Sequence, residues 1–306
     1  METSLRAKMV ITLIAEFNKS NYLRTHLREE KRTDSDLDKN FRYPEHLSKE
    51  RIDLENFSME LLSFSDKAKL FENPSDKIIL QLHGGGYIGA FKNIYRTMAG
   101  LYGEVSQGAS VLTIDYRVGP EFKHPAALED AFAAYSWLLE NGYSEDKIVL
   151  AGDSAGGGLA MALCHLLKDK GYALPCAIIA MSPWTDLLST GDSYKDNYDV
   201  DPVFGNDSSN LIYDNPYVDE TDRSDKYISP LYGDFSGFPP MLIQVGSNEM
   251  LLDDSRFVAE KAKEAGVSVK LSVYEGMFHV FQMGAKLMPE SMKAWNEVSK
   301  FFDVLG

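Results

Sequence analysis

One serine lies at the centre of a glycine-rich segment, LAGDSAGGGLA, at residues 150–160. The residues before it, DKIVL, predict a strand, and those after it, LAMALCHLLKDK, predict a helix. Its core, GDSAG, fits the G-x-S-x-G pattern, in which a sharp strand-to-helix turn presents a serine oxygen as a nucleophile. Gly152 and Gly156 leave room for such a turn, and the helix N-terminus favours developing negative charge. Ser154 is therefore the candidate nucleophile, and a glycine-rich turn without chemistry is the alternative.

A serine hydroxyl is a weak nucleophile at neutral pH, so Ser154 needs a general base. His279 directly follows the last predicted strand, VSVKLSVY, which brings it to the same edge of the sheet as Ser154. We therefore expect His279 to be the base. The remaining histidines are assigned no catalytic role: His26, His46, His83, His124 and His165.

A histidine base needs an acid that fixes its tautomer and stabilises the imidazolium. The segment QVGSNEMLLDDS follows the predicted strand MLIQV, one strand before His279, and carries three acidic residues. Glu249 is nearest to the strand end, and we predict that it is the acid, with Asp253 as the alternative. Asp253 and Asp254 lie a turn later, where they can cap the following helix.

Attack on an acyl carbon creates an oxyanion, which needs hydrogen-bond donors already in place. The segment LQLHGGGYIG, at residues 80–89, follows a predicted strand, and its glycines leave their amides unhindered. We expect Gly84 and Gly85 to donate, together with the amide of Ala155. A phosphate-binding loop is the alternative, but no G-K-[ST] follows and no dinucleotide fingerprint is present.

The elements that must position these residues begin near residue 57. Predicted strands then alternate with helical segments, which is typical of an α/β fold with a mostly parallel sheet and helices on both faces. The predicted strands are FSMELLSF, KIILQL, ASVLTID, KIVLAG, CAIIAMS, MLIQVG and VSVKLSVY. We expect residues 1–56 to form an N-terminal helical cap segment and residues 57–306 a catalytic domain. A polar insertion at about residues 186–227 would complete the cap, because a structureless loop of this length is unusual.

Composition narrows the classes of partner. The chain has 306 residues, a net charge of −15 and 44% hydrophobic residues, enough for a large core. The negative charge argues against nucleic acid and anionic membrane surfaces. No apolar run has the length of a membrane span, and the first residues predict an amphipathic helix rather than a signal peptide. We expect a cytoplasmic protein that acts on a small molecule.

Taken together, these motifs resemble those of the hormone-sensitive-lipase-like esterases, the bacterial family IV carboxylesterases of the α/β-hydrolase superfamily. The resemblance covers roughly residues 57–306. It rests on HGGGYIG (83–89), DYRVGPE (115–121), HPAALED (124–130), GDSAGGGLA (152–160), SPWTDL (182–187), the segment 228–255 and GMFHVF (276–281).

The resemblance implies an α/β-hydrolase fold with a cap and hydrolysis of short- to medium-chain acyl esters through an acyl-enzyme. It assigns Ser154, Glu249 and His279 to the catalytic triad and Gly84, Gly85 and Ala155 to the oxyanion hole, without metal or cofactor. Many relatives carry Asp where this chain has Glu249, so Asp253 remains the alternative acid. Members often dimerise through the last strand and helix, so a homodimer is also an expectation. An amidase, a lipase and a catalytically silent receptor on the same fold are the alternatives.

Overall fold

The computed structural model describes residues 3–19, 35–73, 75–206, 212–218 and 222–305. Within these residues one sheet of eight strands has the order β1-β2-β4-β3-β5-β6-β7-β8. β2 pairs antiparallel with β1 and β4, and all other neighbours pair parallel. The strands are β1 (Leu47–Asp53), β2 (Ser58–Phe64), β3 (Ile78–Leu82), β4 (Ser110–Asp115), β5 (Ile148–Asp153), β6 (Ala177–Met181), β7 (Met241–Gly246) and β8 (Val269–Tyr274). The mostly parallel sheet predicted from the sequence is confirmed.

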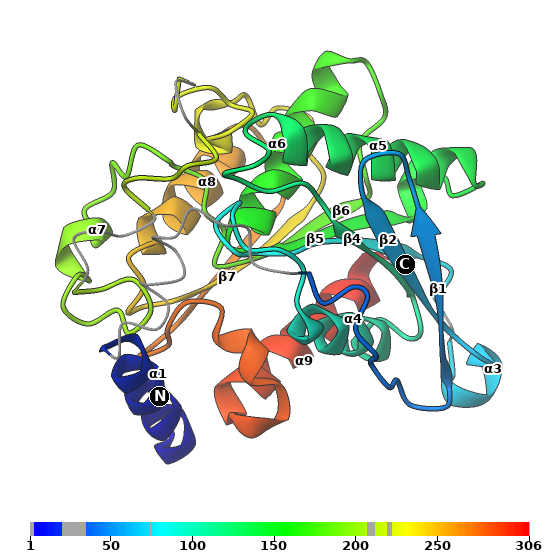
Figure 1. The fold of residues 1–306 in the computed structure, drawn as a ribbon, viewed down its shortest axis with the longest axis horizontal. Helices are drawn as coiled ribbons and strands as arrows, with labels where there is room; N and C mark the ends of the chain where they lie inside the picture. Colours follow the sequence, from blue (N-terminus) through cyan, green and yellow to red (C-terminus); the bar gives the residue numbers. More distant parts are fainter. Residues whose placement is uncertain (1–2, 20–34, 74, 207–211, 219–221, 306) are drawn as a thin grey trace.

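Helices cover both faces of this sheet, as predicted. In Figure 1, α5, α6 and α8 lie on one face, and α4 and α9 lie on the other. The described helices are α1 (Leu5–Lys19), α3 (Lys67–Leu70), α4 (Asn93–Val105), α5 (Ala126–Glu140), α6 (Ala155–Asp169), α7 (Ser193–Asp196), α8 (Leu252–Glu264) and α9 (Pro289–Leu305). Short 3-10 turns are η1 (Glu145–Lys147), η2 (Pro230–Tyr232) and η3 (Phe281–Leu287).

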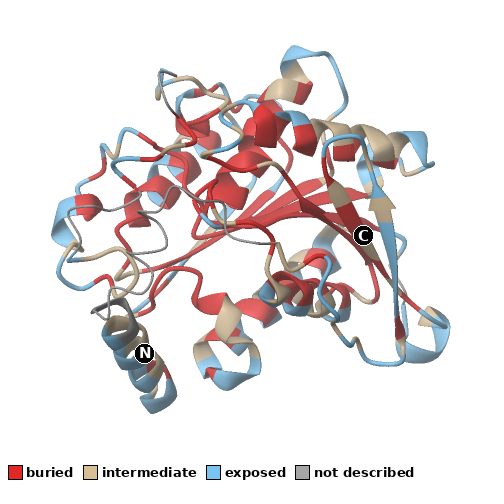
Figure 2. Ribbon diagram, in the orientation of Figure 1, coloured by how far each residue is buried: buried red, intermediate tan, exposed pale blue. Residues whose placement is uncertain are grey.

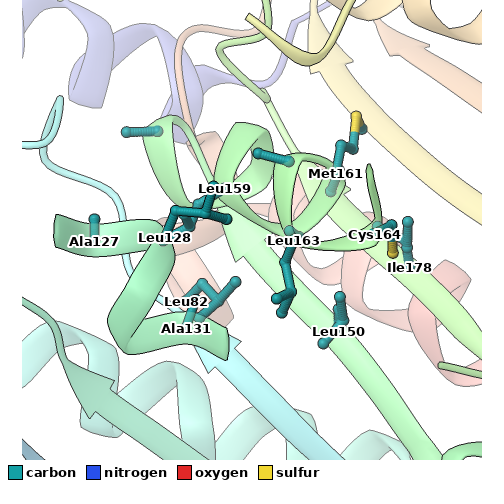
Figure 3. Close-up of a cluster of buried hydrophobic side chains, with 14 of the residues drawn as sticks. Leu82, Ala127, Leu128, Ala131, Leu150, Leu159, Met161, Leu163, Cys164 and Ile178 are labelled. Carbon is teal, nitrogen blue, oxygen red and sulfur yellow. The ribbon is translucent and has the colours of Figure 1, made fainter. Parts of the chain in front are cut away.

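Successive residues of the central strands are buried on opposite faces. In β3, Leu80 and Leu82 belong to the core beneath α5, α6 and α8, whereas Ile79 belongs to the core that includes α4 and α9. Figure 3 shows the first core, where side chains of α6 such as Leu159 and Leu163 lie over strand residues. Burial on both faces explains why these strands read as continuous apolar runs, and Figure 2 shows them buried along their length.

The N-terminal segment differs in part from the helical expectation. Residues 5–19 form α1, and residues 20–34 lie outside the described part of the chain. Residues 47–53, however, form β1, which pairs with β2 from Leu47 opposite Phe64 to Asp53 opposite Ser58. β1 is an edge strand whose side chains are mostly exposed, so its charged sequence LSKERID carries little apolar strand signal. Its place is determined by backbone pairing with β2.

Helix α1 and the polar insertion lie near each other. The insertion follows β6, and in its described residues it holds α7 and turns but no strand. Ala7 of α1 is buried in a cluster with Phe278 and Phe281, and Val203 of the insertion packs against the same cluster. Ser4 also donates to the carboxylate of Glu290 in α9, through its amide and its hydroxyl, at 2.7 and 2.9 Å. Among the helices described, none is long and apolar enough to cross a membrane.

Candidate active site

Ser154 occupies a strained turn between β5 and α6. Its backbone has φ 53° and ψ −124°, a conformation that non-glycine residues rarely adopt. Two flanking glycines permit the turn. A Cβ at Gly152 would lie 2.2 Å from the carbonyl oxygen of Gly156, and one at Gly156 would lie 2.0 Å from that of Leu82. The turn is also held to the next strand, because the Ser154 amide donates to the Met181 carbonyl at 2.9 Å.

Three side chains from separate loops form a continuous hydrogen-bond chain. His279 Nε2 lies 2.9 Å from Ser154 Oγ, and His279 Nδ1 lies 3.0 Å from Glu249 Oε2. A carboxylate only accepts hydrogen bonds, so Nδ1 carries the proton and Nε2 accepts from the serine hydroxyl. All three residues are buried. The structure thus brings together the serine, histidine and glutamate that the sequence analysis selected.

The alternative acid, Asp253, faces other partners. Its Oδ2 accepts the Ser193 amide at 2.9 Å, and its Oδ1 pairs with the Arg256 guanidinium at 3.1 Å. Asp253 therefore links α8 to the start of α7 in the insertion. Of the two carboxylates, only Glu249 hydrogen-bonds to His279 in the described structure.

The glycine loop of residues 83–86 lies against the serine turn. A Cβ at Gly84 would lie 3.1 Å from the Cβ of Ser154, and the Gly84 amide hydrogen-bonds to the carboxyl group of Asp153. Gly85 follows with φ 112°, which a side chain would strain. His83 holds the base of the loop, because its Nδ1 lies 2.7 Å from the Gly84 carbonyl oxygen and its ring stacks on Tyr116.

Ala155 completes the set of predicted donors. It is the first residue of α6 and is fully buried. The first amides of a helix have no acceptor within the helix and carry its positive dipole end, so this amide suits an anion beside Ser154.

Asp153, next to the nucleophile, is a buried acid with an altered titration. Burial raises its pKa to about 7, and the positive charge of a protonated His279 and the amide of Gly84 oppose that rise. A carboxyl group in this position holds the glycine loop while remaining protonated at slightly acidic pH.

Two residues of the insertion reach the site, and the sequence analysis named neither. The Phe204 ring centroid lies 4.7 Å from that of His279, and Asn215 Nδ2 donates to the Gly86 carbonyl at 2.8 Å. The Asp201 carboxylate fixes the Phe204 loop by accepting the amides of Val203 and Phe204, and it also accepts the Met250 amide beside Glu249. These residues follow no helical or strand period, so only their high polar and aromatic content could have marked the segment.

Among the described residues, no three His, Cys, Asp or Glu side chains are grouped so that they could hold a metal ion.

Comparison with known proteins agrees with this architecture. Residues 79–283 match a protein family described as the alpha/beta hydrolase fold. The solved structure of an esterase from the bacterial hormone-sensitive lipase family superposes with a TM-score of 0.83 and 32% sequence identity, covering 100% of both chains. The chain therefore belongs to the α/β-hydrolase family, in its hormone-sensitive lipase branch.

The curated relatives with similar sequences include two bacterial hydrolases. An acetyl-hydrolase of Streptomyces hygroscopicus is 39% identical over 218 residues, which cover 71% of this chain and 72% of the relative. An esterase of Acinetobacter venetianus is 34% identical over 225 residues, which cover 74% of each chain. The first name describes the hydrolysis of acetyl groups, and the second describes the hydrolysis of esters.

Proposed function

We propose that the protein is a serine carboxylesterase that hydrolyses short- to medium-chain acyl esters through an acyl-enzyme. The observation that carries this proposal is the hydrogen-bond chain from Ser154 through His279 to Glu249, with links of 2.9 and 3.0 Å. The esterase and acetyl-hydrolase names of the relatives support the same reaction class.

In the proposed mechanism, His279 Nε2 takes the hydroxyl proton as Ser154 Oγ forms a bond to the acyl carbon. The carbonyl π electrons move to oxygen, and the tetrahedral oxyanion accepts amide hydrogen bonds. Collapse breaks the bond to the alcohol, which leaves with the proton from His279. Water then attacks the acyl-enzyme by the same route, releasing the acid and restoring Ser154. Glu249 holds the Nδ1 proton and stabilises the imidazolium in both steps.

For the oxyanion hole, we assign the amides of Gly85 and Ala155. The Gly84 amide bonds to the Asp153 carboxyl group, so we propose that Gly84 anchors the loop instead of donating to the oxyanion. Gly86, whose carbonyl is held by Asn215, supplies the next amide of the same loop and is a third candidate donor. Each such donor contributes about 10²–10³-fold to the rate in serine hydrolases.

The substrate class follows from the surroundings of the base. Phe204 lies over His279, and Ser154 and His279 are only 6% and 9% exposed. Such restricted access favours small soluble esters, which also fit the predominantly polar insertion.

The decisive experiment uses Ser154→Ala with p-nitrophenyl acetate. We expect the variant to lose turnover by about 10³-fold or more and to lose labelling by a fluorophosphonate probe, because both need the serine oxygen. Asp66→Asn, at an exposed position directly before α3, is the control for activity lost during expression and purification. Full activity in a folded Ser154→Ala variant would reject the proposed mechanism.

A further inference from the structure

A second serine, Ser182, hydrogen-bonds to Glu249 of the candidate triad and to the backbone amide that follows His279. It directly follows β6, is fully buried and has φ 48°. Its amide donates to the Gln244 carbonyl of β7 at 2.7 Å, which anchors it between the two strands. The Ser182 backbone is therefore held in place beside the loops that follow β7 and β8.

The Ser182 hydroxyl makes two hydrogen bonds of different kinds. It donates to Glu249 Oε1 at 2.8 Å, the oxygen opposite to the one that meets His279. It also accepts the backbone amide of Val280 at 3.1 Å. A hydroxyl has one proton and two lone pairs, so it can serve both partners at once.

These contacts constrain the acid and the base independently. Glu249 Oε1 has a second donor in the Gly246 amide, so Gly246 and Ser182 together fix the carboxylate plane. Val280 follows His279 directly and has φ 50°, which is costly for a β-branched residue. The bond from its amide to Ser182 helps to hold that conformation and hence the direction of the preceding imidazole.

We propose that Ser182 is a positioning residue of this active site, whose hydroxyl locks the Glu249 carboxylate and the backbone after His279 into one geometry. The inference rests on the proposed esterase function. Ser182 contacts neither Ser154 nor His279 through any hydrogen bond found in the described structure, so it acts through its two neighbours.

The test measures kcat and KM for p-nitrophenyl acetate in Ser182→Ala and Ser182→Gly. We expect kcat to fall about ten- to hundredfold with KM within about threefold, because small displacements of catalytic groups cost up to about 10²-fold in rate. Ser182→Gly is the safer variant for folding, because glycine accepts a φ of 48° without strain. Ser229→Ala is the matched control: this buried serine accepts the Leu187 amide at 2.9 Å and has no bond to the triad in the described structure.

A double-mutant cycle with Glu249→Ala separates positioning from general loosening of the fold. If Ser182 acts mainly through the acid, Ser182→Gly should lower kcat by less than about threefold once Glu249 is absent. Equal losses in both backgrounds would overturn the role of Ser182 in holding the Glu249 carboxylate, and full kcat in Ser182→Gly beside an active wild type would overturn the proposal as a whole. An inactive wild type would instead overturn the proposed function itself and this inference with it.

Discussion

At the scale of single residues, two acids near the end of β7 have different tasks. Glu249 bonds to His279, whereas Asp253 bonds to the Ser193 amide and to Arg256. The sequence favoured Glu249 because it lies nearer to the strand end, but the spacing alone left Asp253 open. The side-chain direction that separates them depends on the backbone turn after β7, which no local pattern encodes.

Glu249→Gln should therefore reduce kcat for p-nitrophenyl acetate by about 10³–10⁴-fold, because an amide no longer holds the productive tautomer of His279. Asp253→Asn should keep kcat within about threefold and lower the melting temperature instead, because the link between α8 and α7 weakens. Steady-state kinetics and thermal unfolding of both variants provide the measurement. A larger kcat loss in Asp253→Asn than in Glu249→Gln would show that Asp253, and not Glu249, is the triad acid.

A second residue-scale prediction concerns Phe204, whose ring lies 4.7 Å from that of His279. Phe204→Ala should open space beside the base and raise kcat/KM for the octanoate ester relative to the acetate ester about tenfold or more, since each accommodated methylene contributes about 1–3 kcal/mol. A p-nitrophenyl ester series checks this. Phe257→Ala, at a partly exposed position of α8, is the control, and an unchanged ratio in Phe204→Ala would remove Phe204 from the pocket.

At the scale of elements, the strands from β2 to β7 were predictable because their apolar runs are largely buried within the sheet. β8 was also predicted, although Tyr274 is its only buried residue. The first strand was not, because an exposed edge strand is specified by its partner's backbone rather than by its own side chains. Similarly, the sequence predicted an insertion at about residues 186–227 but did not single out Phe204 or Asn215 within it. Turns held by long-range hydrogen bonds have no period from which a side chain's direction can be derived.

The buried ion pair that joins β2 to α4 gives a prediction at this scale. Arg96 is 1% exposed, pairs with Glu60 at 2.8 Å and also donates to the carbonyls of Asp36 and Leu37. Glu60→Ala should lower the free energy of unfolding by about 3–5 kcal/mol, because it leaves a buried guanidinium without its counter-charge.

Urea unfolding measures this loss, and kcat should change little in the folded protein because both residues lie outside the triad. Lys69→Ala is the matched control. It breaks an exposed pair with Asp66 and should cost no more than about 1 kcal/mol. A comparable cost in the two variants would show that the Arg96 pair adds nothing beyond a surface contact.

At the scale of the whole molecule, two buried acids couple stability to pH. Burial raises the pKa of Asp153 to about 7 and, together with the nearby Asp186 carboxylate, that of Asp254 to about 8. Between about pH 4 and pH 8 the folded state therefore holds protons that the unfolded state has released. The free energy of unfolding should fall as pH rises through this window, because the unfolded state binds fewer protons.

Asp254→Asn should flatten this dependence, particularly between pH 6 and 8, because an amide has no proton to release. Urea titrations of the wild type and the variant at pH 5, 6, 7 and 8 check the slope. The substitution keeps an oxygen that can accept the amides of Thr185 and Asp186, which Asp254 binds at 2.8 Å. An identical slope in the variant would exclude Asp254 as a source of the pH dependence.

The order of the strands has a further consequence for when the protein becomes reactive. The serine follows β5 near the middle of the sheet, whereas the glutamate and histidine follow β7 and β8 at its far end, late in the chain. During translation the nucleophile therefore leaves the ribosome long before its base. A nascent chain whose β8 has not yet left the ribosome holds an inert hydroxyl, and reactivity arises only once the segment with Glu249 and His279 has emerged and folded.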